Sequence, residues 1–136
     1  MKTFIFATGV FNILFGILVQ SGFGVATTLP EASPGMVTHL FGAAAAFFGV
    51  ILVLSSRDLE RRGALVAWEG VLRLVGFIVM TYYALYAGYG IRPLLLGATD
   101  GVIGLAYLYF LPRYLGVSLR ELLIDKRSSQ PGGIFR

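Results

Sequence analysis

Four long apolar stretches alternate with short segments that contain charges, prolines or glycines. The stretches cover roughly residues 3–25, 36–55, 63–87 and 93–112. About 20 mostly apolar residues allow an α-helix to cross the hydrocarbon core of a bilayer, and each stretch reaches that length. Two of the separating segments, SSRDLERRG at 55–63 and GYGIRP at 88–93, are typical of turns. The pattern therefore predicts an all-α integral membrane protein with a four-helix transmembrane bundle over residues 1–112.

The residues after the fourth stretch have a different pattern. Pro112 is expected to end the fourth helix, because a proline lacks the N–H that a helix interior requires. The sequence RYLGVSLRELLIDKR at 113–127 then mixes leucines with basic residues. This mixture predicts a short C-terminal amphipathic interfacial helix, followed by a polar tail. Residues 113–136 are thus expected to form a cytoplasmic segment.

The first stretch also has features of a signal peptide. Lys2 precedes the apolar residues, and small residues follow near Val25 and Ala26. The apolar run is, however, longer than the usual core of a signal peptide. We therefore expect a retained helix at this position.

The composition favours a lipid environment over a soluble core. The 136 residues are 57% hydrophobic and 13% charged, whereas a typical soluble domain is about 25% charged. A soluble domain of this size leaves much of its surface in water, so it could not bury so many apolar residues. The chain has no cysteine, which excludes disulfides and thiolate metal sites, and its single histidine, His39, excludes haem ligation by two histidines of one chain. We predict no metal and no cofactor, while a bound lipid, quinone or pigment stays open.

The basic residues indicate an orientation. The net charge of +4 could indicate nucleic acid, but its distribution fits the positive-inside rule better. With four spans, only Arg92 falls on the outer side, and the other basic residues outside the spans fall on the inner side: Lys2, Arg57, Arg61, Arg62, Arg113, Arg120, Lys126, Arg127 and Arg136. We therefore expect a bacterial inner (plasma) membrane protein with both termini in the cytoplasm and no nucleic-acid partner.

Three charged residues interrupt the apolar stretches, and their depths nearly coincide. At a rise of about 1.5 Å per residue, Arg73 lies roughly 15 Å above the inner end of its helix, and Asp100 lies roughly 10 Å below the outer end of its own. In a core about 30 Å thick these depths are within the reach of an arginine side chain. Asn12 falls in the same layer, and Glu69 lies one turn closer to the cytoplasm. Because an unpaired charge at this depth costs about 2.5–3.5 kcal/mol, we predict that Arg73 lies between Glu69 and Asp100 in an intramembrane polar network.

Each apolar stretch also has a face of small and polar residues at helical spacing. Such faces let helices approach closely, so the simplest arrangement turns all four toward a common interior. The faces are Gly9, Asn12, Gly16 and Gln20; His39, Gly42 or Ala43, and Ala46; Glu69, Arg73, Gly76, Met80 and Tyr83; and Gly97, Asp100, Gly104 and Tyr107.

These polar residues permit more than one role. A buried ionic network can fix which helices meet, can bind a substrate or proton, or can contact a partner, and we favour the first of these. Glu69, Asp100 and Arg73 are the candidate catalytic residues. His39, Tyr83 and Tyr107 are candidate ligand or interface residues, and we favour a hydrogen-bonded interfacial histidine for His39 and an anchoring aromatic for Tyr83.

Four sequence segments carry a resemblance to a known group. They are VFNILFGIL at 10–18, THLFGAAAAFFG at 38–49, WEGVLRLVG at 68–76 and DGVIGLAYL at 100–108. With these segments the chain resembles the DoxX-like group of small bacterial four-helix membrane proteins. The resemblance implies a four-helix membrane fold and, by analogy with some members, a place as a membrane subunit of a quinone-linked oxidoreductase. It covers about residues 3–112 and carries over no catalytic residue.

Three functions remain open on the sequence. We favour a non-catalytic accessory or structural subunit of a larger membrane complex, and a redox or energy-transducing complex is one option. The first alternative is a membrane enzyme of the isomerase or cyclase type, in which Glu69 and Asp100 act as acid and base on a lipophilic substrate. The second is a small carrier that works as an oligomer. The expected partners are membrane lipids and either other membrane subunits or further copies of the chain.

Overall fold

The computed structural model describes residues 1–21 and 36–124, and this part of the chain is helical, without strands. The helices are α1 (Lys2–Gln20), α3 (Met36–Arg57), α4 (Leu59–Tyr86), α5 (Ile91–Leu115) and α6 (Leu119–Leu123). The first four are each long and apolar enough to cross a membrane. The prediction of an all-helical chain with four such helices is therefore confirmed. The end of the first predicted span, residues 22–25, and the predicted tail, residues 125–136, lie outside the described residues.

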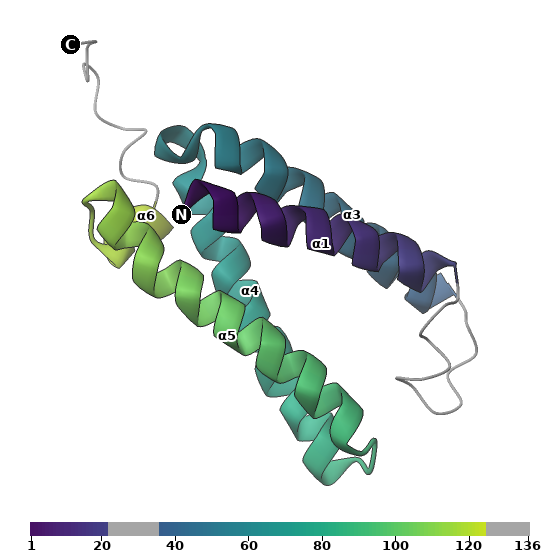
Figure 1. Ribbon diagram of the computed structural model, residues 1–136. Helices are drawn as coiled ribbons and strands as arrows, with labels where there is room; N and C mark the ends of the chain where they lie inside the picture. Colours follow the sequence, from purple (N-terminus) through teal and green to yellow (C-terminus); the bar gives the residue numbers. More distant parts are fainter. Residues whose placement is uncertain (22–35, 125–136) are drawn as a thin grey trace, which may run out of the picture.

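The four long helices form two antiparallel pairs (Figure 1). In the first pair, α1 packs on α3 so closely that glycine meets glycine. A Cβ atom added to Gly9 would come within 2.8 Å of the carbonyl oxygen of Gly49. In the second pair, a Cβ atom added to Gly104 would come within 2.8 Å of the carbonyl oxygen of Gly70. Small residues thus let the backbones touch inside each pair, as is typical of membrane helices.

The two pairs come together at one end and diverge toward the other (Figure 1). The common end holds the N-terminus, the turn between α3 and α4, the end of α5, and α6. The buried apolar core lies there as well, and its members are Ile5, Leu52, Leu59, Val66, Ala67, Tyr107, Leu111 and Leu122. The two pairs therefore pack together around the core at one end, which we call the closed end, and diverge toward the other.

This arrangement differs from the expected inward-facing set of four small and polar faces. The glycines of α1 and α3 face each other inside the first pair, so they are not available to line a common interior. At the ends of the same two faces, Gln20 and His39 are exposed. The close contact of α1 with α3 takes up the small residues of both helices, so bulkier side chains lie between the two pairs.

Both predicted boundaries around the charged turn are corrected. Helix α3 continues to Arg57 and α4 begins at Leu59, so the expected turn of several residues shrinks to Asp58. Asp58 caps α4 by accepting a hydrogen bond from the backbone N–H of Arg61 at 3.4 Å. The two ends extend because Leu59 is buried in the core, which favours helix over exposed turn at that residue.

The expected helix end at Pro112 is wrong, and so is an amphipathic helix that begins at residue 113. Pro112 is inside α5, which ends at Leu115, and Gly116 follows in the left-handed region with φ of +66°. A proline removes one hydrogen bond, but the residues after it can still complete the last turn, and the glycine then ends the helix. The five-residue helix α6 follows and begins with a capping box between Ser118 and Glu121.

Candidate functional site

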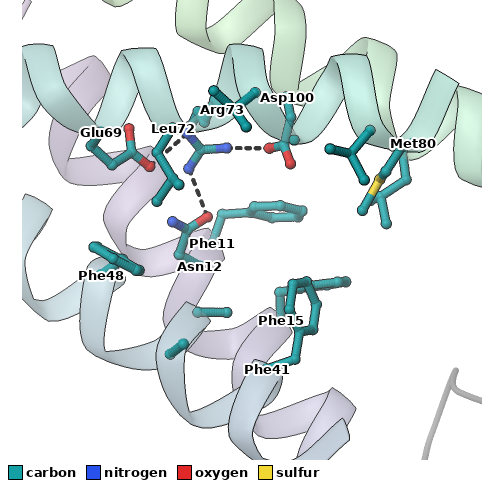
Figure 2. A pocket seen from close by; sticks show the side chains of 16 residues that line it. Phe11, Asn12, Phe15, Phe41, Phe48, Glu69, Leu72, Arg73, Met80 and Asp100 are labelled. Carbon is teal, nitrogen blue, oxygen red and sulfur yellow. Dashed lines mark hydrogen bonds and ion pairs between the residues drawn. The ribbon is translucent and has the colours of Figure 1, made fainter. Parts of the chain in front are cut away.

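Arg73 donates a hydrogen bond from each of its three side-chain nitrogens (Figure 2). Its Nε atom lies 2.6 Å from Oε1 of Glu69, and its Nη2 atom lies 2.9 Å from Oδ1 of Asn12. Its Nη1 atom donates to Oδ1 of Asp100. The structure thus brings together the four residues that the sequence analysis grouped by depth, and we call them the Arg73 network.

Three helices supply the Arg73 network. Glu69 and Arg73 are four residues apart on α4, so they lie on the same face one turn apart. Asp100 comes from α5 and Asn12 comes from α1. Arg73 therefore links α4 to its own partner helix and also to the other helix pair. Its planar guanidinium suits this task, because it presents several donors in fixed directions.

Burial in the Arg73 network is uneven. The side chains of Glu69 and Arg73 are only 6% and 7% exposed, whereas that of Asp100 is 32% exposed. Within the described residues, Oε2 of Glu69 is buried without a hydrogen-bond partner. With both carboxylates ionised, two negative charges face one guanidinium, which leaves one excess negative charge. The network therefore combines two carboxyl groups and one amide with a single cation.

A second polar contact joins the two pairs nearer the closed end. The hydroxyl of Tyr107 on α5 forms a hydrogen bond with the hydroxyl of Thr8 on α1. The Thr8 hydroxyl also lies 3.0 Å from the carbonyl oxygens of Phe4 and Ile5, so its single hydrogen is directed to the backbone and Tyr107 is the donor. Tyr107 is fully buried, and its ring meets Phe4 edge-on at 5.6 Å. Tyr107 is thus part of the core.

A pocket of about 450 Å³ begins at the Arg73 network and lies between the two helix pairs (Figure 2). Its polar residues are the four members of the network. Most of the remaining wall is apolar, and its aromatic members are Phe11, Phe15, Phe41 and Phe48. Pockets of this size accommodate small organic molecules. The site therefore combines a charged end with an aromatic and aliphatic wall.

The structure also places the other candidate residues. Tyr83 is 46% exposed and packs edge-on against Tyr82 and Tyr89, with ring centroids 5.7 Å and 5.4 Å away. His39 is exposed. Neither of them, nor Tyr107, lines the pocket. In the described part of the chain, no three His, Cys, Asp or Glu side chains lie close enough together to hold a metal ion.

Sequence reasoning missed the aromatic wall of the pocket. Phe11 and Phe15 are four residues apart on α1, and Phe41 and Phe48 are seven apart on α3. Each spacing places both rings on one helix face, so the signal was present in the sequence. It was not distinctive, because phenylalanines at helical spacing are equally typical of lipid-facing surfaces.

These features define a class: an all-helical protein with four helices long and apolar enough to span a membrane, joined by a buried ionic network beside an apolar pocket. Comparisons of the chain with protein families, with curated proteins and with solved structures found no match.

Proposed function

We propose that the chain is an integral protein of the bacterial inner membrane with both termini in the cytoplasm. Large apolar side chains are exposed along all four long helices, as a lipid-facing surface requires. The basic residues support the orientation. In the described residues, the closed end carries Lys2, Arg57, Arg61, Arg62, Arg113 and Arg120, and Arg92 lies at the other end.

Within that membrane, we propose that the protein is a non-catalytic accessory subunit of a larger complex, of a redox or energy-transducing kind. One observation carries this proposal: all three nitrogens of Arg73 are occupied by protein groups from three helices. A cation held in this way is suited to fixing helix positions rather than to taking part in a reaction. The resemblance to DoxX-like proteins, some of which look like membrane subunits of oxidoreductases, agrees with this role.

Purification from the native membrane in a mild detergent tests the proposal. We expect the chain to migrate with larger subunits in a native gel, and mass spectrometry of the band identifies them. The Arg73→Met variant should lose this association because the helix pairs move apart, whereas Glu60→Gln, at an exposed residue of α4, should keep it. Migration of the natural chain as a free monomer would contradict the proposal.

A second candidate function is an enzyme that acts on a lipophilic substrate. The supporting observation is that Glu69 and Asp100 both line the pocket, and that Asp100 is partly exposed there. Two carboxyl groups beside a substrate can act as acid and base. The test is incubation of the purified protein with an extract of native lipids, followed by mass spectrometry of the products. Turnover that is lost in both Glu69→Gln and Asp100→Asn would favour the enzyme, and unchanged lipids would reject it.

A further inference from the structure

The polar end of the pocket between the helix pairs offers a carboxylate oxygen to an occupant. Each nitrogen of Arg73 already donates within the network. Asp100 accepts from Arg73 through Oδ1, and Figure 2 shows its second carboxylate oxygen directed away from Arg73. The side chain of Asp100 is 32% exposed, so this oxygen is accessible. The polar end of the pocket therefore matches a group that donates a hydrogen bond.

The remaining wall selects for an apolar body. The aromatic rings of Phe11 and Phe15 on α1 face this space together with Phe41 on α3 (Figure 2). Met80 lines the side formed by α4, and a flexible thioether adapts to occupants of irregular shape. A ligand that lies here removes these side chains from contact with lipid or water, while its polar end reaches the Arg73 network.

We propose that this pocket binds an amphiphile whose apolar body lies against the phenylalanines and whose uncharged or cationic end donates a hydrogen bond to Asp100. A hydroxyl and an ammonium group both meet this requirement. With Asp100 ionised, an anionic end does not, because it would lie beside the carboxylate and like charges repel strongly in an apolar medium. The proposal is independent of whether the chain works as an accessory subunit.

The test compares three probes that share one alkyl chain: dodecylamine, dodecanol and dodecanoate. Each is added in radiolabelled form to the full chain in lipid nanodiscs, and photoreactive analogues locate the binding site. We expect the amine and the alcohol to bind at least about tenfold more tightly than the carboxylate, the effect expected for one hydrogen bond to a charged group. Cross-links should map to α1 and α3 at the phenylalanines of the pocket.

Two kinds of variant separate binding in the pocket from binding elsewhere. Ala44→Trp places a large side chain in the pocket, so it should abolish binding of the amine and the alcohol. Ala43→Trp is the matched control, because Ala43 is exposed on the same helix and does not line the pocket. Asp100→Asn removes the negative charge and should weaken amine binding about tenfold, provided that circular dichroism shows an unchanged fold.

Three outcomes would overturn the proposal. One is equal or tighter binding of dodecanoate. Another is binding that survives Ala44→Trp or cross-links that map to the outward faces of the helices. The third is a partner protein in the pocket, which would be detected if a photoreactive residue at position 44 cross-linked to another polypeptide in native membranes.

Discussion

The contacts inside the helix pairs and the contacts between the pairs have different chemistry. Inside the first pair, backbones touch where Gly9 meets Gly49. Between the pairs, the helices stay further apart, and the long side chain of Arg73 reaches Asn12 across the gap. In the membrane location that we propose, lipid gives no hydrophobic driving force for helices to associate, so close packing and polar contacts have to hold the helices together. Glycine contacts join the helices inside each pair, whereas the Arg73 network, the Tyr107–Thr8 contact and the apolar core at the closed end join the two pairs.

The difference indicates which part of the molecule can change shape. Glycine backbones touch at two places along the first pair, Gly9 with Gly49 and Gly16 with Gly42, so this pair resists separation along its length. The contacts between the pairs lie at the closed end and at the Arg73 network, and beyond them the pocket begins. The position of one pair relative to the other therefore depends on a few side chains, and substitutions can test this.

Replacing Arg73 should have the largest effect. Arg73→Met leaves the buried Glu69 and the partly exposed Asp100 without a cation, which costs about 3–5 kcal/mol of unfolding free energy. The helix pairs should move apart while each pair stays intact. Because the natural chain has no cysteine, spin labels can be attached at residues 18, 40 and 78, all exposed. Pulsed electron spin resonance should show a longer distance between labels at Leu18 and Ile78 and an unchanged distance between Leu18 and Leu40.

A triple variant provides the control for this prediction. When Arg73→Met is combined with Glu69→Gln and Asp100→Asn, the uncompensated charges are gone, so most of the lost stability should return. If Arg73→Met alone left the distance between Leu18 and Ile78 unchanged, the Arg73 network would not hold the pairs together.

Widening the contact inside a pair should have the next largest effect. In Gly42→Ala, the new methyl group would lie 2.8 Å from the carbonyl oxygen of Gly16, so the backbones of α1 and α3 must separate. Overpacking of this kind costs about 1–3 kcal/mol. The distance between labels at Leu18 and Leu40 should increase. The matched control is Gly76→Ala, where no atom lies within 4 Å of the new methyl group and the gain in helix propensity should raise stability slightly.

An equal loss of stability in Gly76→Ala and Gly42→Ala would contradict the prediction, because the effect would then come from the helices themselves. It would also mean that packing inside a helix pair is no tighter than the packing between the two pairs.

The Arg73 network could be predicted from the sequence because two simple quantities determine it. The rise of a helix and the thickness of a bilayer give the depth of Arg73 and Asp100, and helical periodicity gives the shared face of Glu69 and Arg73. These relations hold whatever the packing of the helices. The Arg73 network could therefore be predicted without knowing which helices pair.

The splayed arrangement could not be predicted in the same way. A glycine face shows that some helix approaches closely, but it does not show which one. Gly9 and Gly16 fit a common interior as well as they fit a contact with α3 alone. The predicted helix ends near Asp58 and Pro112 were wrong for a related reason: Leu59 is buried in the core and Leu115 packs against it, so both helices extend beyond the ends that the local sequence indicates.

Removing the second polar contact between the pairs should have a smaller effect. Tyr107→Phe keeps the buried ring and removes the hydrogen bond to Thr8, which should lower the unfolding free energy by about 1 kcal/mol. The check is a double-mutant cycle with Thr8→Val. If the hydroxyls interact, the double variant should lose less stability than the sum of the losses in the two single variants. Fully additive losses would show that the hydrogen bond contributes nothing to joining the pairs.

The contact of α6 with α4 should give the smallest effect. The indole Nε1 of Trp68 donates to the carbonyl oxygen of Leu123 at 3.1 Å, while the Trp68 side chain itself is 56% exposed. Trp68→Phe should therefore cost about 0.5 kcal/mol, the lower limit for a net hydrogen bond. Hydrogen exchange should become faster in α6 and stay unchanged in the paired helices, because Leu122 remains buried in the core.

Tyr114→Phe, at another exposed aromatic residue near the same end, should leave exchange in α6 unaltered. If both variants accelerated exchange throughout the second pair, α6 would be supporting the packing of α4 on α5 rather than resting on a pair that is already complete.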